Sequence, residues 1–196
     1  MPSLLEVNGS AHSRSFHGVS LGIIPRAVRP LQRSALQRIL LVTDGTVTEI
    51  LEAYSGESMR LVKLLEEVTT LDAPLPALEL EPGQPVLRRQ ILLQGKMSLS
   101  TFLFAESYIA LDRLDAPLRD ALLNSHKPIG FLIQDRRMET FREVLGCGHE
   151  PAGPLAHHFD DLAPTDGLIW RTYRMFYRGQ PIMQISEKFP ETYFLD

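Results

Sequence analysis

Long runs of β-favouring residues that follow one another through short turns constrain this fold more than any other feature of the sequence. The clearest case is residues 169–189, where Arg178-Gly179-Gln180 separates two such runs. A second case is residues 86–111, with Gly95-Lys96 at the turn. Strands joined by so few residues pair antiparallel, because a parallel pair needs a crossover of a dozen or more residues. The sequence therefore predicts an antiparallel sheet built from hairpins and disfavours a parallel, doubly wound sheet.

Two helices joined by a short turn are expected before the first strands. Residues 31–42 carry apolar side chains at helical spacing, and Asp44-Gly45 breaks that pattern. A second helix is expected to begin at Thr46, because Thr46 and Glu49 have the spacing of a capping box. Gly56 is expected to end this helix.

A second helical pair is expected between the two hairpins. Asp115 with Pro117 has the form of an N-cap followed by proline in the first turn. Residues 129–134, after Lys127-Pro128, are expected to add one or two further turns. Helix pair, strands, helix pair, strands: this order predicts an α+β fold with an antiparallel sheet.

The remaining segments complete the predicted domain organisation. Residues 59–71 and 138–146 are ambiguous by period, and we interpret them as strands because of their neighbours. Residues 146–167, which contain Gly, Pro and His, are interpreted as a long loop. Residues 31–196 then form a single domain, and residues 1–30 form a weakly structured arm or a strap on its surface.

Charge and composition exclude several classes of protein. The 196 residues carry 20 Lys and Arg against 24 Asp and Glu, whereas a general binder of nucleic acid normally shows a basic excess. A single cysteine excludes a disulfide framework and a multi-thiolate metal site within one chain. There is no apolar run long enough for a membrane span or a signal peptide. We therefore expect a cytoplasmic protein without nucleic acid or membrane partners, with the monomer favoured.

Charged residues that share a strand face with apolar residues are the best candidates for chemistry. Strand alternation places Arg89 and Glu187 each on a face with three apolar side chains. A carboxylate on a buried face must be paired or protonated. An arginine there either lies at a sheet edge, extends its head group to solvent or reaches an anion inside the fold. A purely structural Arg–Glu pair across the sheet is the alternative.

Other conspicuous positions favour structural roles. Glu106, on a face with aromatic residues, and Arg174 are second-rank site candidates, for which a structural role is preferred. His157-His158 precedes Asp160-Asp161 without a spacing typical of metal ligands, so no metal site is expected. Cys147 lacks a neighbouring activating group and is interpreted as a structural thiol. Core and strand packing is the simplest role for the aromatic residues near the C-terminus, Trp170, Tyr173, Phe176, Tyr177 and Phe189.

Four sequence blocks occur in an informative order. They are LLVTDGTVTEILEAY (40–54), VLRRQILLQG (86–95), KPIG (127–130) and YRMFYRGQPIMQISEKF (173–189). In this order and at these separations they resemble the chorismate pyruvate-lyase family, from about Leu31 to Phe189. FAESYIALDRL (104–114) is also typical of one bacterial branch of that family.

The resemblance implies a cofactor-free, carbon–oxygen lyase that converts chorismate to 4-hydroxybenzoate and pyruvate. It also implies helix–turn–helix flaps over an internal ligand cavity. By motif, the arginine that binds the ring carboxylate is Arg89, and the essential glutamate, near the 4-hydroxyl group, is Glu187. The implied product would feed quinone or phenolic-lipid synthesis.

The resemblance also implies contacts from the flaps. Ile129, directly before Gly130 of the KPIG motif, corresponds to a residue that contacts the ligand through its backbone. A further flap contact falls at Val47 or Thr46, where the ubiquinone branch has methionine, so this chain departs from that branch.

A non-catalytic binding domain is the main competing interpretation. The ligand-sensing domains of one class of bacterial repressors share the implied fold and bind small effectors. Those proteins carry a DNA-binding domain upstream, and the roughly 30 residues before the first predicted helix are too few for one. The presence of both Arg89 and Glu187 favours the enzyme. A purely structural or adaptor protein is the third possibility, and it predicts no enclosed pocket.

Overall fold

The computed structural model describes residues 33–124 and 127–195, whose strands form one six-stranded sheet in the order β1-β2-β3-β6-β5-β4. All neighbouring strands pair antiparallel. The strands are β1 Met59–Thr70, β2 Pro85–Gly95, β3 Thr101–Ile109, β4 Thr140–Pro151, β5 Gly167–Tyr177 and β6 Gln180–Pro190. The predicted hairpin-built sheet is confirmed, and so are the two strands that were ambiguous by period.

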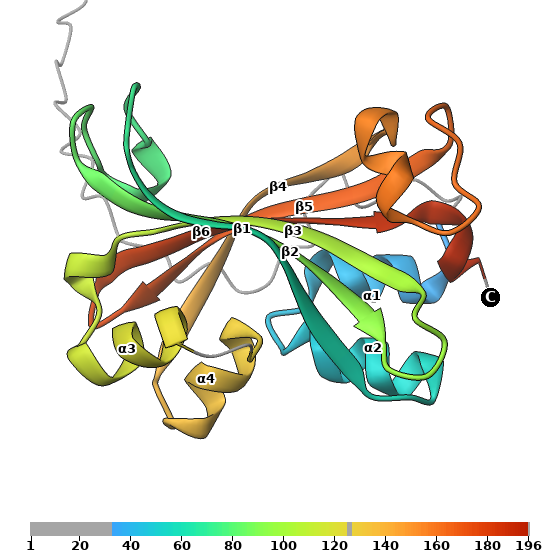
Figure 1. The fold of residues 1–196 in the computed structure, drawn as a ribbon, viewed down its shortest axis with the longest axis horizontal. Coiled ribbons are helices and arrows are strands. Elements are labelled where there is room, and N and C mark those ends of the chain that lie inside the picture. The colour runs from blue at the N-terminus through green and yellow to red at the C-terminus, as the bar shows by residue number, and fades with distance from the viewer. Residues whose placement is uncertain (1–32, 125–126, 196) are drawn as a thin grey trace, which may run out of the picture.

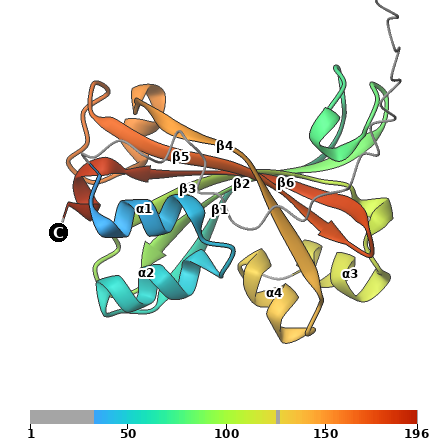
Figure 2. The same ribbon diagram turned by 180° about the vertical axis from the view of Figure 1, so that it is seen from behind.

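The chain builds this sheet as two similar halves. In the N-terminal half, helices α1 and α2 precede strands β1 to β3, and in the C-terminal half, α3 and α4 precede β4 to β6. The halves join through β3 and β6 at the centre of the sheet. Both helix pairs lie on the same face of the sheet (Figures 1 and 2). The helices are α1 Ala35–Val42, α2 Val47–Ser55, α3 Ala116–Asn124 and α4 Ile129–Asp135. The α+β fold with helix–turn–helix flaps is therefore confirmed.

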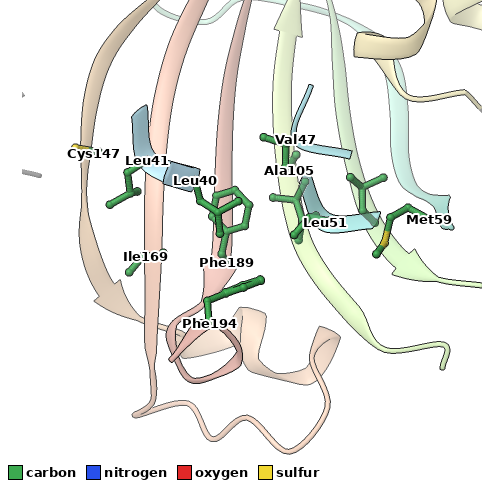
Figure 3. Packing of buried hydrophobic residues seen from close by; sticks show 12 residues of the cluster. Leu40, Leu41, Val47, Leu51, Met59, Ala105, Cys147, Ile169, Phe189 and Phe194 are labelled. Carbon is green, nitrogen blue, oxygen red and sulfur yellow. The ribbon is translucent and has the colours of Figure 1, made fainter. Parts of the chain in front are cut away.

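Each helix pair buries its own apolar cluster against the sheet. Under α1 and α2, Leu40 packs close to Phe189, and Phe194 lies next to them (Figure 3). Under α3 and α4, Leu118 and Leu132 belong to a second cluster with side chains of β5 and β6. Full burial of one such side chain contributes roughly 1.5–3 kcal/mol. Because each pair has a separate core, a space lined by polar groups can lie between them without interrupting either core.

Helix α1 begins with a capping box that the sequence analysis did not identify. Ser34 Oγ accepts from the Gln37 amide at 3.1 Å, and Gln37 Oε1 accepts from the Ser34 amide at 3.1 Å. The capping box expected at Thr46 is wrong, because the Thr46 side chain makes no capping hydrogen bond. The Glu49 amide instead donates to the Thr46 carbonyl at 3.1 Å. The Thr46 side chain lies against Gly130 of the opposite helix pair.

Two other predicted helix boundaries are confirmed. Gly56 ends α2 in the left-handed region with φ of 73°, and Asp115 Oδ1 accepts from the Leu118 amide at 2.9 Å at the start of α3. The predicted arm, residues 1–30, lies outside the described residues. Within the described residues, no helix has the length and apolar character needed to cross a membrane.

The long loop predicted over residues 146–167 is wrong in its first part. Strand β4 continues to Pro151, and a 3-10 helix, η4 (Gly153–His158), follows. A Cβ atom at Gly148 would lie 2.9 Å from the Trp170 ring. Glycine here therefore marks close packing of a strand over an indole ring rather than a loop.

Candidate active site

An internal pocket lies between the sheet and the two helix pairs. The sheet contributes mainly apolar side chains together with three charged ones and one tyrosine. The α1–α2 connection contributes its last residues, and α2 and α4 contribute their first residues. All six first-rank residues predicted from the sequence line this one pocket: Thr46, Val47, Arg89, Ile129, Gly130 and Glu187. Segments that are far apart in the sequence therefore meet at a single site.

Arg89 enters the pocket from β2 and is almost completely buried, with 1% of its surface exposed. Its Nε lies 2.9 Å from Glu66 Oε2 of β1, as an ion pair without hydrogen-bond alignment. Within residues 33–124 and 127–195, the buried Nη2 has no hydrogen-bond partner. Burial lowers the pKa of Arg89, and Glu66 opposes that shift. An arginine remains charged at neutral pH, so the pocket contains a cationic donor with unused hydrogen-bonding capacity.

Glu187 lies on β6, and other residues of the sheet hold its carboxylate in place. Its Oε2 accepts from Arg171 Nε at 2.6 Å, and its Oε1 accepts from the Tyr173 hydroxyl at 3.1 Å. Arg171 also donates from Nη1 to the Thr43 carbonyl at 2.6 Å. Burial, followed by the charge of Glu187, raises the pKa of Tyr173, so its phenol stays protonated and donates. The carboxylate therefore has a fixed orientation.

The sequence analysis missed Arg171, Tyr173 and Glu66. Arg171 and Tyr173 alternate with outward-facing residues along β5, so the strand-face rule that selected Arg89 also applies to them. The predicted role of Tyr173 in core packing is incomplete, because its hydroxyl also donates a hydrogen bond to Glu187. Glu66 could not be selected in this way, because a β-bulge between Lys63 and Leu65 changes which residues of β1 lie on the same face of the sheet as Arg89.

Arg142, on β4, is a further charged side chain of the pocket that the sequence analysis did not single out. Its Nη1 donates to the Asp44 carbonyl in the α1–α2 connection. Its guanidinium carbon lies 6.0 Å from the centroid of the Tyr173 ring. Its Nε is buried and has no hydrogen-bond partner in the part of the chain that the structure describes.

The two second-rank candidates lie away from the pocket. Glu106 accepts hydrogen bonds from Arg88 Nη2 and Gln90 Nε2, each at 2.9 Å, on the opposite face of the sheet. Arg174 Nε donates to Glu143 at 2.6 Å, also on that face. The geometry supports a structural role for both residues.

The two helix pairs touch at Gly130, at the lining of the pocket. A Cβ atom at this position would lie 3.0 Å from Thr46 Cγ2. Both residues line the pocket. The close approach of α4 to the α1–α2 connection therefore depends on the absence of a side chain at Gly130.

The remaining candidates for chemistry have ordinary surroundings. Cys147 is buried, and this burial raises the pKa of its thiol. His158 stacks on Phe104 with ring centroids 6.0 Å apart. In the described ranges, no group of three or more His, Cys, Asp or Glu side chains is placed to hold a metal ion.

The fold and the pocket define a class of protein: an α+β domain in which two helix pairs cover an antiparallel sheet and a small-molecule pocket. Solved structures share this fold. The effector domain of PhnF from Mycobacterium smegmatis has a TM-score of 0.61 at 15% identity, covering 78% of this chain and 92% of that one. The C-terminal domain of the histidine utilization repressor from Pseudomonas syringae has a TM-score of 0.53 at 14% identity, covering 68% and 92%. At such identities the likeness shows the fold alone.

Sequence comparison is more specific. The family model described as chorismate pyruvate-lyase Rv2949c-like matches residues 41–194. The chorismate pyruvate-lyase of Mycobacterium leprae is 31% identical over 172 residues, covering 86% of this chain and 80% of the relative. That of Mycobacterium tuberculosis is 30% identical over 175 residues, covering 86% and 85%. The chain belongs to the chorismate pyruvate-lyase Rv2949c-like family.

Proposed function

We propose that this chain is a chorismate pyruvate-lyase, which cleaves chorismate to 4-hydroxybenzoate and pyruvate. Membership of the family supports this function. The observation that carries the proposal is the buried Nη2 of Arg89, which has no hydrogen-bond partner among the described residues. Arg89 lines the same pocket as Glu187. A buried donor without a partner is costly to the folded protein, and an anionic ligand removes that cost.

Arg89 is assigned to the ring carboxylate of the substrate. A planar guanidinium binds a carboxylate through parallel, charge-assisted hydrogen bonds. The chain as a whole has a net charge of −4, so its overall field does not attract a dianion. Recognition of chorismate then depends on cationic side chains inside the pocket, where a low local dielectric strengthens each interaction.

Glu187 is assigned to proton transfer at the other end of the ring. The reaction removes the proton from C4 and breaks the bond between C3 and the ether oxygen, and the ring becomes aromatic. Enolpyruvate leaves with that oxygen and takes up a proton to give pyruvate. Arg171 and Tyr173 fix the Glu187 carboxylate, which orients it toward the reacting carbon without reorganisation during the reaction. After the reaction, Glu187 can accept a hydrogen bond from the product phenol.

Turnover of chorismate by the purified chain tests the proposal. We expect 4-hydroxybenzoate and pyruvate in equal amounts, without added metal or nucleotide, measured by chromatography and a coupled pyruvate assay. Glu187→Gln keeps one acceptor oxygen for Arg171, and the Tyr173 hydroxyl can turn to accept from the new amide NH2 group. The substitution removes the base, so turnover should fall about 10²- to 10⁴-fold. Glu106→Gln makes the same substitution on the opposite face of the sheet and should retain full turnover.

A non-catalytic binding domain is the alternative, because solved structures of regulator domains share the fold. That alternative predicts that the wild-type chain binds 4-hydroxybenzoate, with a rise in melting temperature, but forms no product from chorismate. Normal turnover by Glu187→Gln would instead leave the lyase in place and remove Glu187 from its assigned role.

A further inference from the structure

Arg142 is a cationic group of the pocket to which neither the sequence motifs nor the proposed chemistry gives a role. Arginine has five N–H donors and no acceptor. The Asp44 carbonyl accepts from Nη1, and the buried Nε has no partner within the described ranges of the chain. No ion pair to Arg142 is found among the described residues, unlike Arg89, Arg171 and Arg174. An anion from outside the chain would complete its surroundings.

The order of strands places Glu187 between Arg142 and Arg89. Arg89 lies on β2, Glu187 lies two strands away on β6, and Arg142 lies two strands further on β4. Neighbouring strands are about 4.8 Å apart, so each step spans about 10 Å of sheet. All three side chains line the same pocket, because they point to the face covered by the helix pairs. Across the direction of the strands, the pocket therefore has one cationic group on each side of its carboxylate. Along the strands, Arg142 lies opposite Met175, four residues from Arg171, which is the neighbour of Glu187.

The shape of chorismate matches this order of charges. One carboxylate lies on C1, the hydroxyl lies across the ring on C4, and the enolpyruvyl group on C3 carries the second carboxylate. With the first carboxylate on Arg89 and C4 at Glu187, the enolpyruvyl group on C3 projects beside Glu187, from the half of the ring that lies farther from Arg89. Arg142 is the cationic side chain of the pocket on that side.

We propose that Arg142 binds the carboxylate of the enolpyruvyl group. This inference rests on the proposed function and extends it to the part of the substrate that leaves as pyruvate. Arg142 then contributes to affinity for chorismate but not for 4-hydroxybenzoate, which lacks the second carboxylate. Arg89 contributes to both, so the two arginines differ in which ligands they recognise.

The test compares the two ligands on the same variants. Arg142→Gln should raise the KM for chorismate roughly 10- to 100-fold, the cost of losing hydrogen bonds to a charged group. Its Kd for 4-hydroxybenzoate, measured by calorimetry, should change less than about threefold. Arg142→Lys keeps the charge but not the planar donor, so its KM should rise less than that of Arg142→Gln. Arg178→Gln, at an exposed hairpin turn, is the matched control and should change neither value.

Two outcomes overturn the inference. An unchanged KM removes Arg142 from substrate binding. Equal losses for both ligands mean that Arg142 acts only by holding the Asp44 backbone. If Arg142→Gln does not fold, Arg142→Lys alone must raise the KM at least threefold with an unchanged Kd for 4-hydroxybenzoate. If the wild-type chain shows no turnover, the proposed lyase fails, and calorimetric binding of chorismate to the same variants still decides the role of Arg142.

Discussion

The two halves of the molecule each bury one arginine completely, and the two arginines have different surroundings. Arg89 lies on the middle strand of the N-terminal half, and Arg171 lies on the middle strand of the C-terminal half, each 1% exposed. Arg171 has a hydrogen-bonded carboxylate and a hydrogen-bonded carbonyl, each at 2.6 Å. Arg89 has an ion pair at 2.9 Å, and its Nη2 has no partner in the described structure.

The difference comes from which neighbouring strand provides the carboxylate. For Arg171, the inner neighbour on β6 is Glu187, and the outer neighbour on β4 is Cys147. For Arg89, the inner neighbour on β3 is Ser107, and the outer neighbour on β1 is Glu66. Arg171 and Arg89 occupy the same position on the middle strand of their halves. Arg171 is paired with a carboxylate on the strand toward the centre of the sheet, whereas Arg89 has only a serine there, which leaves room for a ligand.

The largest expected effect is a loss of folding stability when Arg171 is replaced, which we do not expect for Arg89. Arg171→Met leaves the Glu187 carboxylate buried without its cation, so the free energy of unfolding should fall by about 3–5 kcal/mol. Chemical denaturation at neutral pH measures this change. Arg174→Met, on the opposite face of the same strand and partly exposed, is the control and should lose about 1 kcal/mol or less. Equal losses in the two variants would contradict the comparison.

Arg89→Met should affect ligand binding much more than folding stability. Glu66 keeps its ion pair with Lys63 at 2.7 Å, so the free energy of unfolding should change by no more than about 1 kcal/mol. Binding of 4-hydroxybenzoate should weaken at least about thirtyfold, as expected when one partner of a buried charge pair is removed. Calorimetry of ligand binding and denaturation of the same sample measure the two effects. Arg88→Met, on the neighbouring outward-facing position, should leave binding intact.

A smaller effect is expected at the tyrosine that shares Glu187 with Arg171. Tyr173→Phe removes one hydrogen bond to a charged group, so the free energy of unfolding should fall by about 1.5–3 kcal/mol at pH 7. Because folding raises the pKa of this phenol, its contribution is present below pH 10 and is lost as the pH rises further. The difference in stability between wild type and Tyr173→Phe should therefore narrow above pH 10. A constant difference up to pH 12 would contradict the buried, protonated phenol.

The strand pattern of the sequence was enough to predict the sheet and the faces that carry Arg89 and Glu187. Both follow from alternation over long strands and from recognisable turns. Which side chains meet across strands could not be predicted, because bulges shift the register. The hairpin turn alone would pair Arg171 with Ser186, but a bulge between Met175 and Phe176 moves it to Glu187.

Contacts between the two halves were also out of reach of local sequence rules. The capping-box pattern at Thr46 is genuine as a pattern, but Gly130 lies against that side chain in the folded chain. Ser34 and Gln37 supply the corresponding box in α1. The family motifs located Ile129 and Gly130 without explaining them. The explanation is that α4 must approach the α1–α2 connection closely to cover the pocket.

Strand β1 has a bulge between Lys63 and Leu65, and β4 has one between Val144 and Gly146. These bulges have a further consequence for association between molecules. Strands β1 and β4 are the two outer strands of the sheet, and in the described part of the chain each has one edge without a neighbouring strand. Both edge strands also expose apolar side chains, such as Val68 and Phe141. Regular edges of this kind template pairing with a second chain, whereas a bulge bends the strand and interrupts its row of donors and acceptors. The bulge in β1 that hides Glu66 from sequence analysis, together with that in β4, thus also helps to protect the molecule against edge-to-edge aggregation at high concentration.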